Sequence, residues 1–121
     1  MIKSYTDLEQ SKKLAEILPL KSTDMCWFEG EPFVEAVIGY EKERAESHRQ
    51  AGMEMYPCWS LAALLSVIPF PQLSKDKLGN GKIGWMVSAY PMNCRYDSCW
   101  HDDPIDACVD MIVKLHELNL L

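Results

Sequence analysis

The sequence predicts an α+β domain in which three helices pack on an antiparallel sheet of about four strands. Three stretches repeat their apolar residues with helical spacing, and about four show the residue types and alternation of strands. Strands and helices do not alternate in units that suggest parallel βαβ connections, which favours helices laid on an antiparallel sheet. With 121 residues, 48% of them hydrophobic, we expect one domain over residues 1–121.

The stretch 101–121 predicts a capped helix with a wide apolar surface. Asp103 is a suitable N-cap, and Pro104 fits the first helical position. An ordinary surface helix has an apolar arc of about a third of a turn, so this helix is expected to need cover from a sheet and a neighbouring helix, or from a second subunit. His116 falls inside the arc, either as a core-edge histidine or as a binding residue. The apolar residues are Ile105, Cys108, Val109, Met111, Ile112, Leu115 and Leu118.

Two earlier helices are expected. Thr6 and Glu9 form a capping-box pattern, which predicts a first helix that ends near Leu18. The second helix is expected over 57–68, where leucines recur at core spacing. Trp59 lies at its start and is either an exposed contact residue or a side chain covered by a neighbouring loop.

Strands are expected over 23–28 and 33–38, joined as a hairpin, with a short strand over 53–56. A further hairpin is expected between 82–90, which alternates apolar and polar residues, and 94–101. Prolines and glycines punctuate these segments where turns are expected.

Two stretches are mainly polar. Residues 41–50 have good helix propensity but little to bury, so the excursion at about 41–52 is expected to be either a short exposed helix or a mobile loop. Residues 72–82 are expected to be a polar connection.

The net charge of −6 and the pI of about 5.0 argue against direct binding of nucleic acid, because the chain lacks a basic cluster for phosphates. Docking on a basic protein surface, or mimicry of a nucleic acid, remain open. The sequence has no apolar run long enough for a membrane helix and no secretion signal. Its odd number of cysteines, five, favours reduced thiols. A cytoplasmic protein is therefore expected.

Cys99 and His101 would share one strand face, followed by Asp102, which makes a thiol nucleophile conceivable. The alternative is a half-buried cysteine beside a surface histidine. A zinc site built from these two residues with Cys58 and Cys94 lacks the usual ligand spacing. We therefore expect no metal and no cofactor.

Three parts of the chain stand out as strings: TDLEQSKKLAEILPL at 6–20, PCWSLAALL at 57–65, and DPIDAC with KLHEL within 103–118. They resemble a family of small bacterial proteins often carried on prophages and other mobile elements. The family has no activity from which a functional residue could be transferred. The resemblance implies a bacterial, intracellular accessory protein.

We therefore expect a non-enzymatic domain that binds another protein, with a homodimer as an open alternative. The candidate contact residues are Trp59, Trp100 and His116. The first alternative is a small enzyme or ligand-binding domain that uses Cys99 and His101. The second is a nucleic-acid-related regulator or an acidic mimic.

Overall fold

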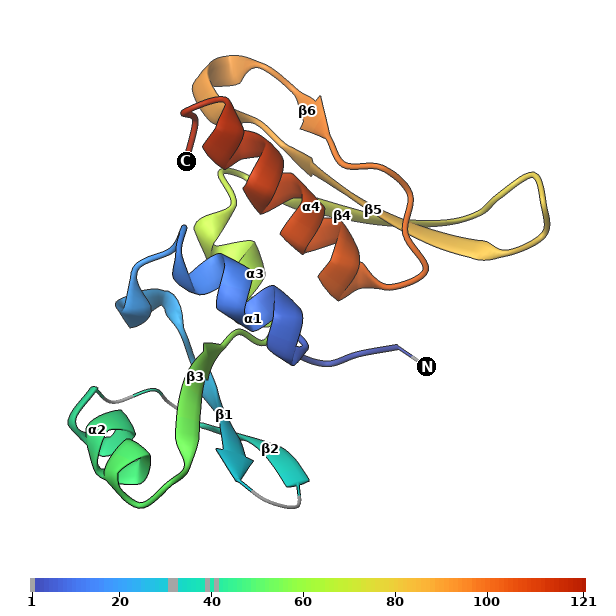
Figure 1. Ribbon diagram of the computed structural model, residues 1–121. Coiled ribbons are helices and arrows are strands. Elements are labelled where there is room, and N and C mark those ends of the chain that lie inside the picture. The colour runs from blue at the N-terminus through green and yellow to red at the C-terminus, as the bar shows by residue number, and fades with distance from the viewer. Residues whose placement is uncertain (1, 31–32, 39, 41) are drawn as a thin grey trace. The chain divides into compact units, whose positions relative to one another are not determined.

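The computed structural model describes residues 2–30, 33–38, 40 and 42–121, which contain four α-helices and two three-stranded antiparallel sheets (Figure 1). The predicted α+β class is confirmed. The finer expectation of three helices on one sheet of about four strands differs from this arrangement. The chain divides into two compact units, Tyr5–Ala63 and Met1–Ser4 with Leu64–Leu121. Each unit has its own sheet, and the expectation of one domain over 1–121 stays a prediction.

The Tyr5–Ala63 unit is built around the central strand of its sheet, whose order is β2-β1-β3. Both neighbours of β1 run antiparallel to it, which confirms the expected first hairpin and the short strand after the polar excursion. Its elements are α1 (Leu8–Ala15), a 3-10 turn (Leu20–Ser22), β1 (Met25–Gly30), β2 (Phe33–Ile38), α2 (Lys42–Gln50) and β3 (Glu54–Cys58).

The capping box of α1 lies one residue later than predicted. Asp7 accepts a hydrogen bond of 2.8 Å from the backbone N–H of Gln10, whose side chain accepts one from the Asp7 N–H. The hydroxyl of Thr6 is buried instead, where it bonds Ser11 Oγ at 2.7 Å and accepts the Trp59 N–H. The prediction of Thr6 as N-cap was wrong because this hydroxyl belongs to the core.

The polar stretch after β2 contains a helix, which settles the choice between helix and loop for 42–50; residue 41 lies outside the described residues. Ala45 is the buried residue of α2, with 1% of its surface exposed. It packs in a small core with Cys26 and Met55. Ala45 therefore joins this mainly solvated helix to the sheet, and Arg44 and His48 add contacts with the Phe28 ring of β1.

The Leu64–Leu121 part has a sheet of order β4-β5-β6. Its elements are the greater part of α3 (Leu61–Val67), β4 (Gln72–Lys77), β5 (Ile83–Ala89), a 3-10 turn (Pro91–Asn93), β6 (Tyr96–Asp97) and α4 (Pro104–Glu117). The second helix was expected from residue 57. It begins later because Pro57 and Cys58 pair with β1 as the end of β3.

The prediction of a polar connection over 72–82 was wrong, because Gln72–Lys77 forms a strand paired along its length with β5. An edge strand next to an apolar neighbour needs little hydrophobic content of its own. The turn that follows places Gly81 at φ 85°, a conformation that glycine adopts without strain. The hairpin of β4 and β5 runs well beyond α4 (Figure 1).

Most of the apolar arc of α4 is buried, although Val109 is half-buried and Leu118 is 49% exposed, and the helix packs against β5. Asp103 is its N-cap, as predicted, and accepts the Ile105 N–H at 2.8 Å. The buried residues of the arc therefore need no cover from a second subunit, and a homodimer stays a prediction. His116 is exposed, contrary to its expected place in the arc, because the last turn of α4 is exposed from residue 116 onward. The fully buried residues are Ile105, Ala107, Cys108, Met111, Ile112 and Leu115.

The helices of the described residues are all too short or too polar to cross a lipid bilayer.

Candidate functional site

The residues singled out as contact candidates differ in exposure. Trp59 has 0% of its surface exposed, and its indole N–H donates to Ser22 Oγ at 2.9 Å. It is a core residue, so it offers no contact surface. Trp100, 41% exposed, and His116 do reach solvent. Within the residues that the structure describes, neither makes a polar side-chain contact that would define a site.

Asp110 is the carboxylate that organises the predicted cysteine–histidine pair. One of its oxygens, Oδ2, accepts hydrogen bonds from His101 Nε2 and from the backbone N–H of Cys99, each at 2.9 Å. Burial raises the pKa of Asp110, but the bonds from His101 and Cys99 outweigh it, so the pKa lies below its ordinary value. Asp102, the acid expected beside the pair, is exposed and does not take this place.

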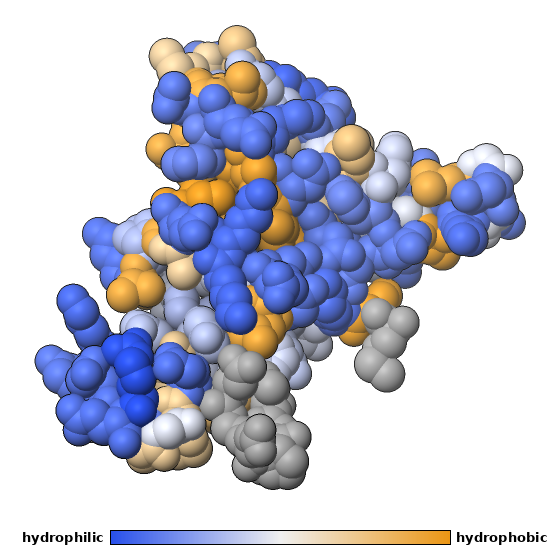
Figure 2. All heavy atoms as spheres, viewed as in Figure 1, coloured by the Kyte–Doolittle hydropathy of each residue, from blue (hydrophilic) through white to orange (hydrophobic). Residues whose placement is uncertain are grey.

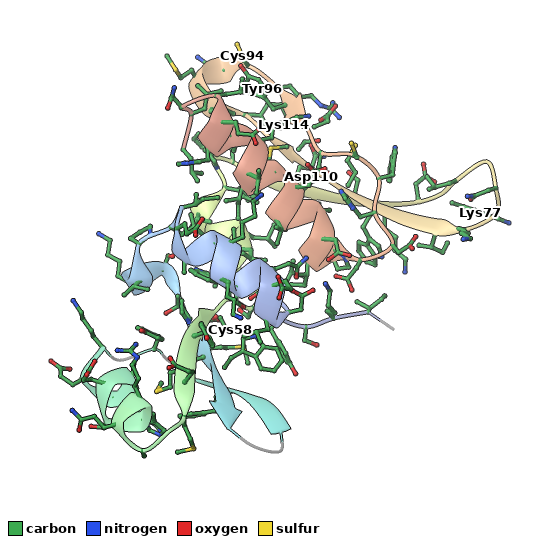
Figure 3. The ribbon with its side chains drawn as sticks, in the orientation of Figure 1. Cys58, Lys77, Cys94, Tyr96, Asp110 and Lys114 are labelled. Carbon is green, nitrogen blue, oxygen red and sulfur yellow. The ribbon has the colours of Figure 1, made fainter. Side chains whose placement is uncertain are left out.

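Lys114, one turn after Asp110 on α4, holds the other end of the same segment. Its Nζ donates to the backbone oxygen of Asp97 at 2.8 Å, and Figure 3 shows both α4 side chains labelled near β6. The Asp97 carboxylate accepts hydrogen bonds from Arg95 and from Ser88. Both bonds lower its pKa, and the bond from Arg95 has the larger effect. The hydrogen bonds of Asp110 and Lys114 therefore hold residues 97–101 against α4, which is a structural role.

The thiols divide into two exposed and three buried groups. In the part of the chain that the structure describes, Cys99 Sγ makes no hydrogen bond to His101, so the ring is oriented by Asp110 but not joined to the sulfur. Burial raises the pKa of Cys58, and it raises that of Cys108 to about 12. These buried thiols are poor nucleophiles. Within the described residues no three His, Cys, Asp or Glu side chains are grouped to hold a metal ion.

Thiol labelling of the native protein tests this division. We expect Cys94 and Cys99 to react with iodoacetamide, and Cys26, Cys58 and Cys108 to be protected until urea unfolds the chain, because alkylation requires access to the sulfur. Mass spectrometry of tryptic peptides measures each rate. Cys94 is the internal reference. A Cys99 rate about tenfold above that of Cys94 would contradict the structural reading and favour thiol chemistry.

Asp110→Ala is expected to destabilise the protein by about 1–2 kcal/mol at neutral pH, since it removes the acceptor of two hydrogen bonds on a partly buried carboxylate. The folded pKa of Asp110 is depressed, so its contribution is present above the ordinary pKa of 3.8 and is lost as pH falls through the folded value. The difference in the free energy of unfolding between the wild type and Asp110→Ala should therefore become smaller at acid pH. Urea unfolding at several pH values measures it.

The exposed Asp102 provides the matched control, because Asp102→Ala removes the same charge from the connection that Asp110 contacts. It is expected to change stability by less than about 0.5 kcal/mol. Equal effects of the two substitutions would show that charge, rather than the Asp110 hydrogen bonds, matters.

The outer edge of β4 is the second candidate site. Trp85 in β5 lies opposite Lys75 in β4. Trp85 exchanges both backbone hydrogen bonds with His101 on its other side, at 2.7 and 2.8 Å. Its N–H and C=O therefore point away from β4. In an antiparallel pair the facing residue then points its own backbone groups outward, so those of Lys75 face the open edge.

By strand alternation the backbone groups of Leu73 and Lys77 face the same way. The Lys77 N–H donates to Asp76 Oδ1 at 2.8 Å, a local bond at the exposed end of the strand. Among the described residues, the N–H groups of Leu73 and Lys75 have no hydrogen-bond partner. Lys75, Asp76 and Lys77 are exposed. This edge, residues 72–77, is called the open edge below.

The open edge carries positive charge on a chain whose net charge is −6. The hairpin contains Lys75, Lys77 and Lys82 against the single acid Asp76. Lys75 Nζ lies 5.1 Å from the centroid of the Trp85 ring, over its face. Figure 2 shows mainly hydrophilic side chains over this hairpin, and Figure 3 labels Lys77 far along it from α4.

No protein-family model, no curated protein and no solved structure matches the chain. The resemblance to proteins of mobile elements stays a prediction.

Proposed function

We propose that this chain is a non-enzymatic interaction domain that binds an extended segment of another protein as an additional strand along β4. The observation that carries the proposal is the pair of outward N–H groups of Leu73 and Lys75, on a strand that among the described residues pairs only with β5. Edge strands offer a row of unpaired backbone groups to which a partner strand can bond. The opposite edge of this sheet, β6, has two residues and offers much less.

The length of the open edge supports the proposal. Six residues of β4 are paired with β5, so three of them, spaced by two, present backbone groups to a partner. Edge strands are normally protected by bulges, prolines or inward-pointing charges. Residues 72–77 contain no proline and no bulge in their register with β5, although the two lysines give partial protection against strands of like charge.

A display library of extended peptides, selected on the wild-type protein, tests the proposal. Leu73→Pro removes one outward N–H and leaves the hydrogen bonds to β5 in place. Proline is tolerated on an edge strand at a position whose N–H faces solvent. Leu73→Ala is the matched control, because it shortens the same side chain and keeps the N–H. We expect peptides that bind the wild type and Leu73→Ala with similar affinity. Their affinity for Leu73→Pro should be at least about tenfold lower.

A second measurement does not depend on a variant. Binding along β4 should slow amide hydrogen exchange of Leu73 and Lys75 in the wild-type protein, because both N–H groups would then be hydrogen-bonded. A library that yields no binders, or binders that leave these two amides unchanged, would rule the proposal out.

Thiol chemistry at Cys99 is the second candidate function. The observation in its favour is the bond between Asp110 and His101, which is the arrangement an orienting acid has in a nucleophile–base–acid group. It stands second because the sulfur and the ring are not hydrogen-bonded in the described structure. The labelling rates of Cys99 and Cys94 decide it.

A further inference from the structure

We propose that the partner segment at the open edge is acidic, with carboxylates at alternate positions that face Lys75 and Lys77. This inference rests on the proposed binding of a strand along β4 and specifies the chemistry of that strand. It begins from the side chains that a new strand would meet.

The two lysines point to the same face of the sheet, since they are two residues apart on one strand. Their partners across the sheet are Trp85 and Ile83, which lie on that face too. A strand added to β4 would place alternate side chains about 4.5–5.5 Å from those of Lys75 and Lys77, measured between Cβ atoms. Carboxylates at those positions would form ion pairs, and lysines would be repelled.

Trp85 positions one of these charges. Its ring lies under the Lys75 ammonium, which keeps the ammonium on this face of the sheet. Ile83, opposite Lys77, is 46% exposed and extends the apolar surface of this face beyond the part near α4. The face therefore combines apolar surface with two cations, which suits a strand of acidic residues with apolar stems.

A second copy of the chain is a poor occupant. Pairing of β4 with another β4 would bring Lys75 and Lys77 next to the same lysines of the other copy, and like charges across a strand pair are destabilising. The lysines therefore distinguish a foreign acidic strand from self-association.

A nucleic acid is also a poor occupant. Base stacking requires an open aromatic face, but Lys75 already covers a face of Trp85. A phosphate backbone also lacks the alternating N–H and C=O groups with which an added strand would pair along β4.

Two synthetic peptides test the inference on the full chain, one of alternating Glu and Thr and one of alternating Lys and Thr. Both have strand propensity and differ in the sign of their charge. The Glu peptide is expected to bind at least about tenfold more tightly, to slow exchange of the Leu73 and Lys75 amides, and to weaken as salt is added. NMR titration measures both affinity and exchange.

Charge reversal supplies the matched variants. Lys75→Glu with Lys77→Glu should reverse the preference between the two peptides. The control, Lys21→Glu with Lys42→Glu, changes the net charge equally at two exposed lysines outside the hairpin and should keep the preference for the Glu peptide. Equal loss of binding in both double variants would overturn the inference, since it would assign the effect to net charge.

N-methylation of the Glu peptide separates strand pairing from simple charge attraction. Methyl groups on alternate amides of one phase should abolish binding, and those of the other phase should be tolerated, because only one edge of the peptide faces β4. If both methylated peptides bind as well as the parent, the lysines act as a charged patch and the inference is wrong.

The remaining outcomes separate the inference from the proposed function. If library peptides bind along β4 but carry no excess of acidic residues, the inference fails and the proposed function stands. If neither peptides nor library members slow the two amides, both fail. Tighter binding of an oligothymidylate than of the Glu peptide, or a dimer that Leu73→Pro dissociates, would assign the open edge to nucleic acid or to self-association and overturn the inference.

Discussion

Trp59→Ala is expected to lower the free energy of unfolding of the Tyr5–Ala63 unit by about 3–5 kcal/mol, the range for removing a large aromatic side chain from a packed core. Trp59 has no exposed surface. Its indole N–H donates to Ser22 Oγ, and its backbone N–H donates to Thr6 Oγ1 at 3.2 Å. The substitution leaves a cavity in this core. Urea unfolding followed by far-UV circular dichroism measures the loss without relying on tryptophan fluorescence.

Two other variants calibrate this result. Trp59→Phe keeps much of the volume and removes the indole N–H, so it should lose less than Trp59→Ala. Trp100→Ala removes the same side chain from a position that is 41% exposed, and it should cost less than about 1 kcal/mol. If Trp59→Ala were as mild as Trp100→Ala, Trp59 could not be the core residue described above.

Alkaline pH is expected to destabilise the protein through Cys108. Burial, followed by the negative charge of Asp103, raises the pKa of this thiol from 9.0 to about 12. Below pH 9 the thiol is neutral in both states, so its contribution to stability is intact. Between pH 9 and about 12 it ionises in the unfolded chain but is held neutral in the folded one, and unfolding is favoured. The three-unit difference corresponds to about 4 kcal/mol at the upper end.

Cys108→Ala isolates this contribution. The alanine variant is expected to be less stable at neutral pH because it loses a buried sulfur, but its stability should fall less steeply above pH 9. Other groups that titrate in this range, including Cys58, are present in both proteins and cancel in the difference. Urea midpoints measured at a series of pH values provide the comparison. Parallel curves for the two proteins would contradict the assigned pKa.

Local signals in the sequence predicted the elements that they alone determine. The cap of α4 follows from Asp103 and Pro104, which act within one turn of the helix. The hairpin of β1 and β2 follows from two strand-forming runs separated by a turn. Both depend on residues that are close in sequence, where propensity and hydrogen-bond geometry are decided.

Other features depend on contacts between distant residues. Gln72–Lys77 looks like a loop by composition and becomes a strand because β5 pairs with it. Asp110 is a polar residue between apolar ones on α4 and reads as solvated, yet it receives hydrogen bonds from Cys99 and His101 of an earlier segment. The spacing of Asp110 and Lys114 by four residues places them on one helix face, which was the available signal for a shared partner.

The bond from the Lys3 backbone to Asp103, at 2.5 Å, joins residues one hundred positions apart. Lys3 Nζ also pairs with Asp106 in the first turn of α4. Both contacts lie within the unit made of Met1–Ser4 and Leu64–Leu121. The chain leaves this unit after Ser4 and re-enters it at Leu64, with the whole of Tyr5–Ala63 in between. During synthesis all residues of the Tyr5–Ala63 unit are translated before those of the other unit are complete. The unit of Met1–Ser4 and Leu64–Leu121 can fold only after α4 has been made. The connectivity of the chain therefore determines the order in which the two units can fold. Residues 2–4 are among the earliest translated, but their contacts with α4 are among the last to form.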